Sequence, residues 1–282
     1  MSVRVSLHLL AVGFCRHCER ITIQGGGLRP VVFPSIAALI MHPTQGPVLY
    51  DTGYAEHFFE ATGTFPEKLY RWITPVNIPD EEKLHRQLSK YGVSLSDITF
   101  CLISHFHADH IAGLKNLPDA KFITMQSEYN HIILMGRFSG LRKAFLPGLL
   151  PDDFISRLTF AENMKKVSLN TAWSALGEGY DLLGDGSLVA VRLPGHSPGQ
   201  MGLLLNDEQG REVLLCADAV WSRKAFLEER YPSMIARLVT DDWYMYKNTV
   251  KQLHLISQAH PEICILPSHC KESLEQYGFS KC

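Results

Sequence analysis

The stretch SHFHADHIAG, residues 104–113, carries four side chains of the types that bind metal ions: His105, His107, Asp109 and His110. It follows the apolar run ITFCLI, residues 98–103, which is short enough for a buried strand. In an extended chain His105 and His107 point the same way, because side chains repeat with period two. Histidine and carboxylate are the usual ligands of zinc and related first-row ions. The spacing therefore predicts a metal site at the end of this strand.

Three more residues of ligand type follow apolar, strand-like runs in the second half of the chain. They are His196 after residues 188–193, Asp218 after residues 212–216, and His269 after residues 262–266. Each one alone would more often be an ordinary loop residue than a ligand. Together with the first cluster they give seven candidates, which is enough for two metal ions.

The elements that must position these side chains are predicted from hydrophobic periodicity and turn residues. The predicted strands are residues 3–12, 36–42, 47–50, 98–103, 121–125, 188–193, 201–205, 212–216 and 262–266. The predicted helices are residues 80–91, 109–117 and 242–259. The order of strands followed by a helix occurs twice. This predicts an α/β protein with two sheets packed face to face, helices outside, and a site where strand ends meet.

Residues 126–165 differ from the rest of the chain, because leucine, phenylalanine, methionine and arginine alternate there with glycine and proline breaks. This composition predicts helical pieces that form a lid. The apolar, aromatic part of the segment, residues 132–160, would suit an acyl chain. A pair of outer helices covering the core explains the same pattern equally well.

Composition and charge exclude several classes of function. The net charge is −2 over 282 residues, with 46% hydrophobic and 20% charged residues, so nothing indicates a nucleic-acid or membrane-surface partner. No apolar run is long enough to cross a bilayer, and residues 1–15 are interpreted as a first strand rather than a signal peptide. The seven scattered cysteines are typical of a reducing compartment, so a cytoplasmic location is expected.

The order of the seven candidates, together with Asp51-Thr52-Gly53 after a predicted strand, resembles the metallo-β-lactamase fold superfamily of hydrolases. The resemblance covers roughly residues 3–275, and it implies one domain over residues 1–282 with a four-layer αββα sandwich. It further implies one metal ion held by His105, His107 and His196, and a second held by Asp109, His110 and His269. Asp218 would bridge the two ions, and Asp51 would orient a ligand histidine.

The resemblance also implies a chemistry. Two divalent ions, zinc or alternatively iron, manganese or cobalt, would share a hydroxide that attacks a lactone or carboxylic ester. Asp109 would pass a proton to the leaving group, so Asp109 and Asp218 are the expected catalytic residues. Asp218 argues against a true β-lactamase, which usually has a cysteine or histidine at that position.

Within the superfamily, the chain looks most like the N-acyl homoserine lactone lactonases, which act on a small molecule and are often homodimers. One departure is Trp221, where those enzymes usually have a tyrosine that helps to hold the substrate carbonyl. Tyr54, Tyr70 and Tyr129 are candidate replacements. A glyoxalase II-like thioesterase, a phosphodiesterase and a non-catalytic, metal-binding regulatory protein remain alternatives.

Residues 15–18, CRHC, form a CxxC motif. No partner ligands and no thioredoxin-like pattern lie nearby, which favours a structural or incidental role for Cys15 and Cys18. His17 and the glycines at positions 25–27 are instead candidates for a loop over the site.

Overall fold

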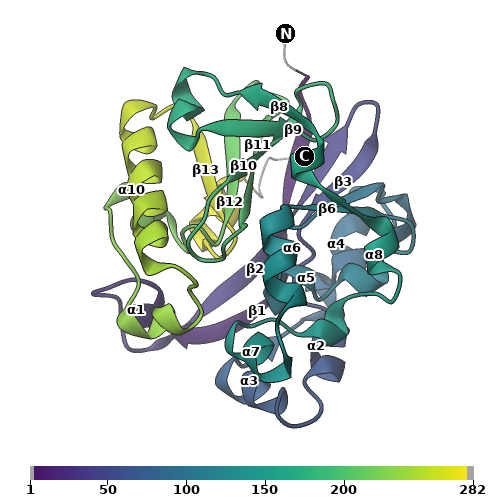
Figure 1. The fold of residues 1–282 in the computed structure, drawn as a ribbon, viewed down its shortest axis with the longest axis vertical. Coiled ribbons are helices and arrows are strands. Elements are labelled where there is room, and N and C mark those ends of the chain that lie inside the picture. The colour runs from purple at the N-terminus through teal and green to yellow at the C-terminus, as the bar shows by residue number, and fades with distance from the viewer. Residues whose placement is uncertain (1–2, 278–282) are drawn as a thin grey trace.

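The computed structural model describes residues 3–277, and its strands form two sheets (Figure 1). In the seven-stranded sheet the order is β4 (Val76–Asn77), β1 (Ser6–Cys18), β2 (Pro30–His42), β3 (Gly46–Tyr50), β5 (Phe100–Leu102), β6 (Lys121–Thr124) and β7 (Leu158–Phe160). In the six-stranded sheet the order is β13 (Cys264–Pro267), β12 (Glu212–Ala217), β11 (Met201–Asn206), β10 (Leu188–Arg192), β9 (Glu178–Asp181) and β8 (Lys165–Ser168).

Helices surround the two sheets. The α-helices are α1 (Glu19–Thr22), α2 (Glu56–Ala61), α3 (Lys68–Ile73), α4 (Leu84–Ser89), α5 (Ala108–Ile111), α6 (Gln126–Ile133), α7 (Arg137–Arg142), α8 (Phe154–Arg157), α9 (Arg223–Leu227), α10 (Trp243–Ala259) and α11 (Lys271–Tyr277). Short 3₁₀ helices are η1 (Asp80–Glu82), η2 (Leu95–Asp97), η3 (Leu114–Asn116), η4 (Pro147–Leu149), η5 (Ala161–Asn163), η6 (Thr171–Leu176) and η7 (Met234–Leu238). No helix within residues 3–277 is long and apolar enough to cross a bilayer.

Three apolar cores separate four layers. Leu9 and Leu203 belong to the core between the sheets, and Leu10, the next residue along β1, belongs to the core under the outer helices. This alternation follows from the period-two geometry of a strand. On the far side, Leu214 of β12 packs with Val250 of α10. The predicted four-layer αββα sandwich is confirmed.

The strands that precede the candidate ligands run in the same direction within each sheet. β3 is parallel to β5, and β12 is parallel to β13. β10 and β12 are both antiparallel to β11, so they too share a direction. The loops that follow these strands therefore emerge at one edge of the sandwich.

Two predicted elements are close to what the structure shows. The predicted helix over residues 242–259 is α10, and its N-cap residue Asp242 accepts hydrogen bonds from the backbone N–H groups of Tyr244 and Met245, both at 2.9 Å. The predicted strands over residues 36–42 and 47–50 lie in β2 and β3, which a turn at residues 43–45 joins in an antiparallel hairpin.

The predicted helix over residues 80–91 is wrong as a continuous helix. It is split into η1 and α4 at Lys83, whose backbone is extended with φ −61° and ψ 138°. The Lys83 ammonium group lies 3.0 Å from a Glu56 oxygen and 3.1 Å from an Asp80 oxygen. The contact to Glu56 is long-range in sequence, so the periodic pattern could not indicate this break.

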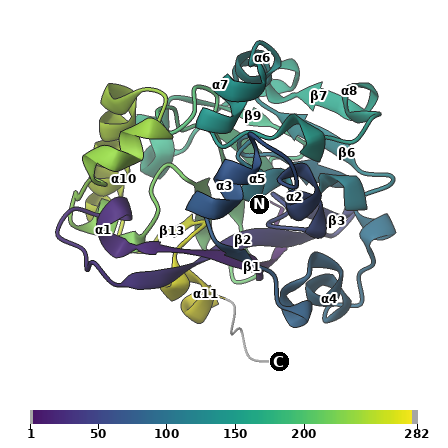
Figure 2. The same cartoon turned by 90° about the horizontal axis from the view of Figure 1, so that it is seen from below.

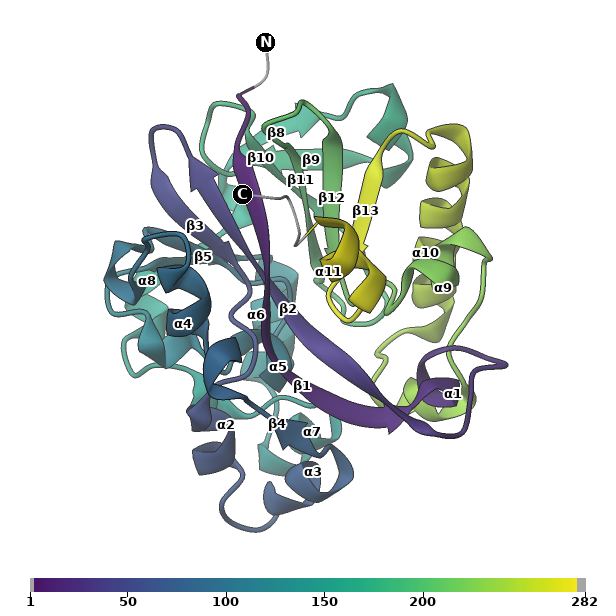
Figure 3. The same cartoon turned by 180° about the vertical axis from the view of Figure 1, so that it is seen from behind.

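The first strand is much longer than predicted. β1 continues to Cys18 and pairs with β2 along its length, with an irregularity between Ala11 and Phe14. Figure 3 shows these two strands crossing the whole molecule, from the N-terminal end to α1. The hairpin tip thereby reaches the segment before α10, where the Gln24 backbone N–H donates to the Tyr231 carbonyl at 2.8 Å (Figure 2).

Candidate metal centre

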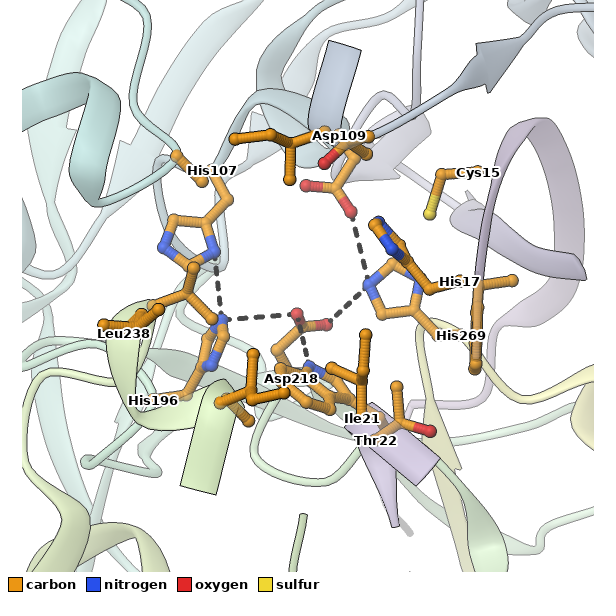
Figure 4. Close-up of a pocket in the computed structure, with 18 of the residues that line it drawn as sticks. Cys15, His17, Ile21, Thr22, His107, Asp109, His196, Asp218, Leu238 and His269 are labelled. Carbon is orange, nitrogen blue, oxygen red and sulfur yellow. Dashed lines mark hydrogen bonds and ion pairs between the residues drawn. The ribbon is translucent and has the colours of Figure 1, made fainter. Parts of the chain in front are cut away.

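The structure brings all seven predicted ligand residues to one edge of the sandwich. In the described part of the chain they form two groups whose ligand atoms lie within 4.8 Å of one another. The first group is His105, His107, His196 and Asp218, and the second is Asp109, His110 and His269. Figure 4 shows five of these side chains around the floor of a pocket.

Two residues at the strand ends have left-handed backbone conformations that are uncommon for non-glycine residues. Asp51, directly after β3, has φ +59°, and Ala217, the last residue of β12, has φ +46°. Such conformations persist only where the surrounding structure enforces them, and they concentrate at functional sites. Here the turn at Ala217 directs the next side chain, Asp218, into the cluster.

Hydrogen bonds determine which ring nitrogen of His110 and His105 faces the centre. His110 Nδ1 lies 2.7 Å from Asp51 Oδ2, an acceptor, so Nδ1 donates. The Ser104 hydroxyl donates to the same carboxylate at 2.7 Å and can accept from His105 Nδ1 at 2.9 Å. Both histidines therefore present an unprotonated Nε2 to the centre when neutral. These hydrogen bonds are the geometric basis for the expected role of Asp51 in orienting a ligand histidine. Ser104 takes part in the same network and was missed by the sequence analysis.

His269 is oriented by a backbone group. Its Nδ1 lies 2.7 Å from the Pro34 carbonyl oxygen, which can only accept, so Nδ1 carries the hydrogen. Nε2 then faces carboxylate oxygens of Asp218 at 3.1 Å and Asp109 at 3.2 Å. In the neutral ring, the lone pair of Nε2 faces two anionic carboxylates, which is unfavourable. A cation at this point, either a proton or a metal ion, makes the arrangement favourable.

The other half of the cluster has the same excess of lone pairs. His196 Nε2 lies 3.0 Å from His107 Nδ1 and 3.3 Å from Asp218 Oδ2. Four polar atoms of the cluster are buried and have no hydrogen-bond partner: His105 Nε2, His110 Nε2, His196 Nδ1 and Asp218 Oδ1. Buried polar groups without partners are costly, so the donor set fits positively charged metal ions between these side chains.

Asp218 lies between the two groups. Its Oδ2 is 3.3 Å from His196 Nε2, whereas its Oδ1 is 3.1 Å from His269 Nε2 and 3.4 Å from His110 Nε2. The indole N–H of Trp221 donates to Asp218 Oδ2 at 2.8 Å. Trp221 therefore uses its single donor to orient this carboxylate, and that donor is not free for a substrate.

The electrostatics divide the histidines into two kinds. Burial and, to a smaller extent, the neighbouring His196 lower the pKa of His107 to about 3. Burial also opposes charge on His110, but the carboxylates of Asp109, Asp51 and Asp218 outweigh it and raise the pKa of His110 to about 10. In the absence of metal, His110 is therefore protonated at neutral pH, and its proton takes the place of a metal cation.

We expect zinc binding to release this proton, because a histidine must lose its hydrogen before it can coordinate a metal ion. The affinity of the metal-free protein for zinc should therefore rise as pH is raised towards the pKa of His110, about 10. Calorimetric titration with zinc in buffers of different ionisation enthalpy measures the released protons directly. A zinc affinity that does not change with pH would contradict this assignment of charge.

Glu128 of α6 is a second residue that the sequence analysis missed, because no motif surrounds it. Its carboxylate is buried and accepts hydrogen bonds from the Ser197 hydroxyl and, at 2.9 Å, from the Gly199 backbone N–H. A Cβ atom at Gly199 would lie 2.3 Å from the Glu128 backbone nitrogen, so only glycine allows this approach. Glu128 thereby holds the loop that carries His196.

Replacing Glu128 with glutamine is expected to weaken zinc binding about tenfold, because the loop loses a charge-assisted anchor next to His196. The measurement is zinc affinity by chelator competition, with thermal unfolding as a check on the fold. Glu162→Gln is a matched control, since Glu162 accepts a 2.8 Å hydrogen bond at the start of the same helix and pairs with Arg192 of β10, but makes no hydrogen bond to residues 195–199. Equal zinc affinity in both variants would show that Glu128 has only a general structural role.

A cavity of about 460 Å³ opens beside the cluster. Five of the candidate ligands line it: His107, Asp109, His196, Asp218 and His269. The rest of its wall is Cys15, His17, Ile21, Thr22, Phe33, Tyr54, Tyr70, Ile73, Thr74, Ala144, Trp221, Ile235, Ala236, Leu238 and Val239. The predicted lid segment, which is helical in α6, α7 and α8, thus contributes Ala144 alone. The remaining wall comes from the β1–β2 hairpin, α3 and the residue after it, the region of η7, and the loops after β3 and β12, which contribute Tyr54 and Trp221.

Trp221 stands where the related lactonases usually have a tyrosine, and the structure distinguishes between the three tyrosines that could take over its role. Tyr129 packs against Phe160, with ring centroids 5.6 Å apart, and does not line the cavity. Tyr54 and Tyr70 both line it. Tyr54 is hydrogen-bonded to Cys15, whose pKa is raised to about 11 by burial, so this cysteine of the CxxC motif is not a reactive thiolate. Tyr70 is therefore the tyrosine in the cavity wall whose hydroxyl is free to contact a ligand.

With the geometry established, comparison with known proteins identifies the family. Residues 33–255 match the sequence profile described as the "Metallo-beta-lactamase superfamily". The chain belongs to this superfamily. The predicted family resemblance is confirmed.

Several similar superfamily members are named N-acyl homoserine lactonases. AttM of Azorhizobium caulinodans is 28% identical over 208 residues, which cover 71% of this chain and 70% of AttM. AttM of Agrobacterium fabrum is 29% identical over 157 residues, 54% of this chain and 53% of that protein. AiiA of Bacillus thuringiensis subsp. kurstaki is 25% identical over 190 residues, 67% of this chain and 66% of AiiA. The match to the Agrobacterium protein thus spans about half its length.

Solved structures of superfamily members share the fold over nearly the whole chain. One is an N-acyl homoserine lactone hydrolase with the product N-hexanoyl-L-homoserine bound at its catalytic metal centre. It superposes with a TM-score of 0.71 at 20% identity and covers 98% of this chain and 97% of that one. The dizinc quorum-quenching lactonase AidC superposes with a TM-score of 0.63 at 17% identity. The match covers 96% of this chain and 89% of AidC. At these identities the comparison establishes the fold.

Proposed function

We propose that this chain is a metal-dependent hydrolase that opens the ring of N-acyl homoserine lactones or related lactones. The observation that carries the proposal is the position of Asp218. Its carboxylate has one oxygen towards each of two histidine-rich groups, at the floor of an apolar cavity. The names of the similar lactonases support the choice of substrate class.

In the proposed centre, one divalent ion would be held by His105, His107 and His196. The other would be held by Asp109, His110 and His269, and Asp218 would be shared by both. Zinc suits a site made of imidazole and carboxylate, with iron, manganese and cobalt as alternatives. Metal ions held there would lower the pKa of a bound water and polarise a carbonyl oxygen, which is the chemistry that lactone hydrolysis needs.

The protein's own side chains provide the proton transfer. Asp109 lines the cavity, and its Oδ2 lies 3.2 Å from His269 Nε2. In the metal-free protein, burial opposes its charge, but His110 and His269 overcome this and lower the pKa of Asp109 to about 2; bound metal cations would likewise favour the ionised carboxylate. Asp109 can therefore accept the proton of the attacking water and pass it to the leaving alkoxide as the ring opens.

The cavity wall favours a neutral, apolar substrate over the alternatives. Among the described residues that line it, none is lysine, arginine or glutamate. A glutathione thioesterase needs cations for the two carboxylates of its substrate, and a phosphodiesterase gains from a basic wall beside its metals. Neither requirement is met here by a side chain, whereas an acyl amide fits an apolar wall with a few polar groups.

The test combines metal analysis with a panel of substrates. Purified protein is analysed for zinc, iron, manganese and cobalt per chain. It is then assayed with N-hexanoyl homoserine lactone, an aryl ester, S-lactoylglutathione and a phosphodiester. Two metals per chain with turnover of the lactone are expected. Turnover of S-lactoylglutathione or the phosphodiester alone would replace the proposal with one of the alternatives, and two metals without any turnover would favour a binding protein.

A further inference from the structure

Two candidate ligands that contact each other come from different sheets. His107 lies in the loop after β5 of the seven-stranded sheet, and His196 lies in the loop after β10 of the six-stranded sheet. His196 Nε2 is 3.0 Å from His107 Nδ1, a contact that Figure 4 marks with a dashed line. The groups that hold one loop against the other therefore determine the separation of these two rings.

The His196 loop is held by the segment in front of α10. The Asp241 backbone N–H donates to the His196 carbonyl at 3.1 Å, and the Asp242 backbone N–H donates to the Gly195 carbonyl at 3.0 Å. A shift of this segment would therefore be transmitted to His196 through two adjacent backbone hydrogen bonds.

The Asp241 side chain connects this segment to the helices that follow the first sheet. Its carboxylate is largely buried, and each of its oxygens has a partner of its own. His131 Nε2 of α6 lies 3.0 Å from Oδ2, and Lys143 Nζ, directly after α7, lies 2.7 Å from Oδ1. Lys143 Nζ also donates to the Thr240 carbonyl at 3.1 Å. Salt screens a partly buried ion pair less than a fully exposed one, so this contact can fix a distance.

The residue after Lys143 is hydrogen-bonded to the other ligand loop. The Ala144 carbonyl accepts a 2.9 Å hydrogen bond from the backbone N–H of Ala108, which lies between His107 and Asp109. Ala144 has φ +52°, a left-handed conformation that the surrounding structure must enforce in an L-residue. Residues 143–144 thus connect the His107 loop to Asp241, and Asp241 connects them to the His196 loop.

The second group of candidate ligands is held by different partners, all from the first sheet. The Asp51 carboxylate and the Pro34 carbonyl orient its two histidines, and the Ser35 hydroxyl donates to the Asp109 carbonyl at 2.7 Å. Loss of the Lys143–Asp241 ion pair would leave these three hydrogen bonds in place.

We propose that the Lys143–Asp241 ion pair is a positioning device for one of the two metal ions. It sets the separation of His107 and His196, and thereby the affinity of the ion that these residues would share with His105. Neither Lys143 nor Asp241 is among the described residues that line the cavity, so both act through the ligand loops. The inference rests on the metal centre of the proposed function and does not depend on the substrate.

The first experiment measures the two zinc affinities of the parent and of Lys143→Met by competition with a chromophoric chelator. Methionine keeps an unbranched side chain and removes the charge. We expect one zinc ion to bind at least about tenfold more weakly and the other to keep its affinity. Lys143→Arg retains a cation for Asp241 and should restore most of the affinity. Unchanged affinities in Lys143→Met, or an equal loss for both ions, would overturn the inference.

Lys83→Met is the matched control. The Lys83 ammonium group also has two partners, Glu56 and Asp80, and its side chain is 29% exposed, compared with 24% for Lys143. Both variants should lose a similar amount of thermal stability in the metal-free state, because each loses one partly buried ion pair. Only Lys143→Met should lose zinc affinity. An equal loss of affinity in Lys83→Met would show a general effect of stability and would overturn the specific role of Lys143.

A double-mutant cycle identifies the affected ion. In a His196→Ala background, Lys143→Met should change zinc affinity by less than about twofold, because the ligand that the ion pair positions is gone. In a His269→Ala background, the same substitution should keep its full effect. The reverse pattern would place the effect on the other ion and would overturn the inference.

The same measurements separate failure of the inference from failure of the proposed function. A parent protein that binds two zinc ions and shows the selective loss, but hydrolyses no lactone, would contradict the proposed function and support the positioning role. Lactone turnover together with unchanged zinc affinities in Lys143→Met would do the opposite. A parent protein that binds no zinc would contradict both.

Discussion

Asp218→Asn is expected to lower the rate of lactone hydrolysis at least about a hundredfold and to lower the metal content below two ions per chain. The substitution keeps the size of the side chain and an acceptor for the Trp221 indole, but it removes the negative charge that lies between the two histidine groups. Metal analysis after gel filtration and steady-state kinetics at fixed zinc concentration measure the two effects separately.

Asp181→Asn is the control for the loss of a buried carboxylate. Asp181 is buried, and it accepts hydrogen bonds from the Gly184 and Gly186 backbones at 3.0 Å in a turn at the opposite edge of the sheet. We expect this variant to lose stability and keep two metals. Full metal content and full activity in the Asp218 variant would show that the bridging role belongs to another group.

Gly195→Ala is expected to destabilise the protein by at least about 4 kcal/mol, which is exceptional for a single substitution. Gly195 has φ +131°, and a Cβ atom there would lie 2.2 Å from the backbone nitrogen of Tyr246 and 2.3 Å from its Cα. Those atoms belong to the first turns of α10 and cannot move alone. Chemical unfolding at equilibrium measures the change in free energy.

Gly184→Ala separates the backbone strain from the clash. Gly184 also has a positive φ, +82°, but nothing lies within 4 Å of a Cβ atom built there. The free energy of unfolding of this variant should fall by only about 1 kcal/mol, which is the usual cost of a left-handed backbone conformation for an L-residue. A similar loss in both variants would mean that the loop before His196 can move away from α10.

The candidate ligands could be predicted from sequence because they depend on local order. Each follows a short apolar strand, and parallel strands bring their ends to one edge whatever the length of the connections. The start of α10 near residue 242 was predictable for the same reason, since the cap residue Asp242 acts on the next three residues. The single domain over residues 1–282 and the homodimer stay predictions.

The cavity wall could not be predicted in the same way, because it depends on tertiary packing. The composition of residues 132–160 suggested an acyl-binding surface, yet Ile21 of the hairpin and Ile73 of α3 form the wall instead. Similarly, Glu128 is 69 residues away in sequence from its hydrogen-bond partner Ser197. Neither contact leaves a periodic pattern along the chain.

The direction of the strands has a practical consequence for handling the molecule. Because β3, β10 and β12 all end at the candidate metal centre, the turns that begin them lie at the opposite edge of the sandwich. The turn before β12 is exposed at residues 208–210. A fluorophore or a surface linker attached at Gln209 would leave the cavity open to solution, so the chain can be immobilised in a defined orientation for single-molecule or biosensor measurements.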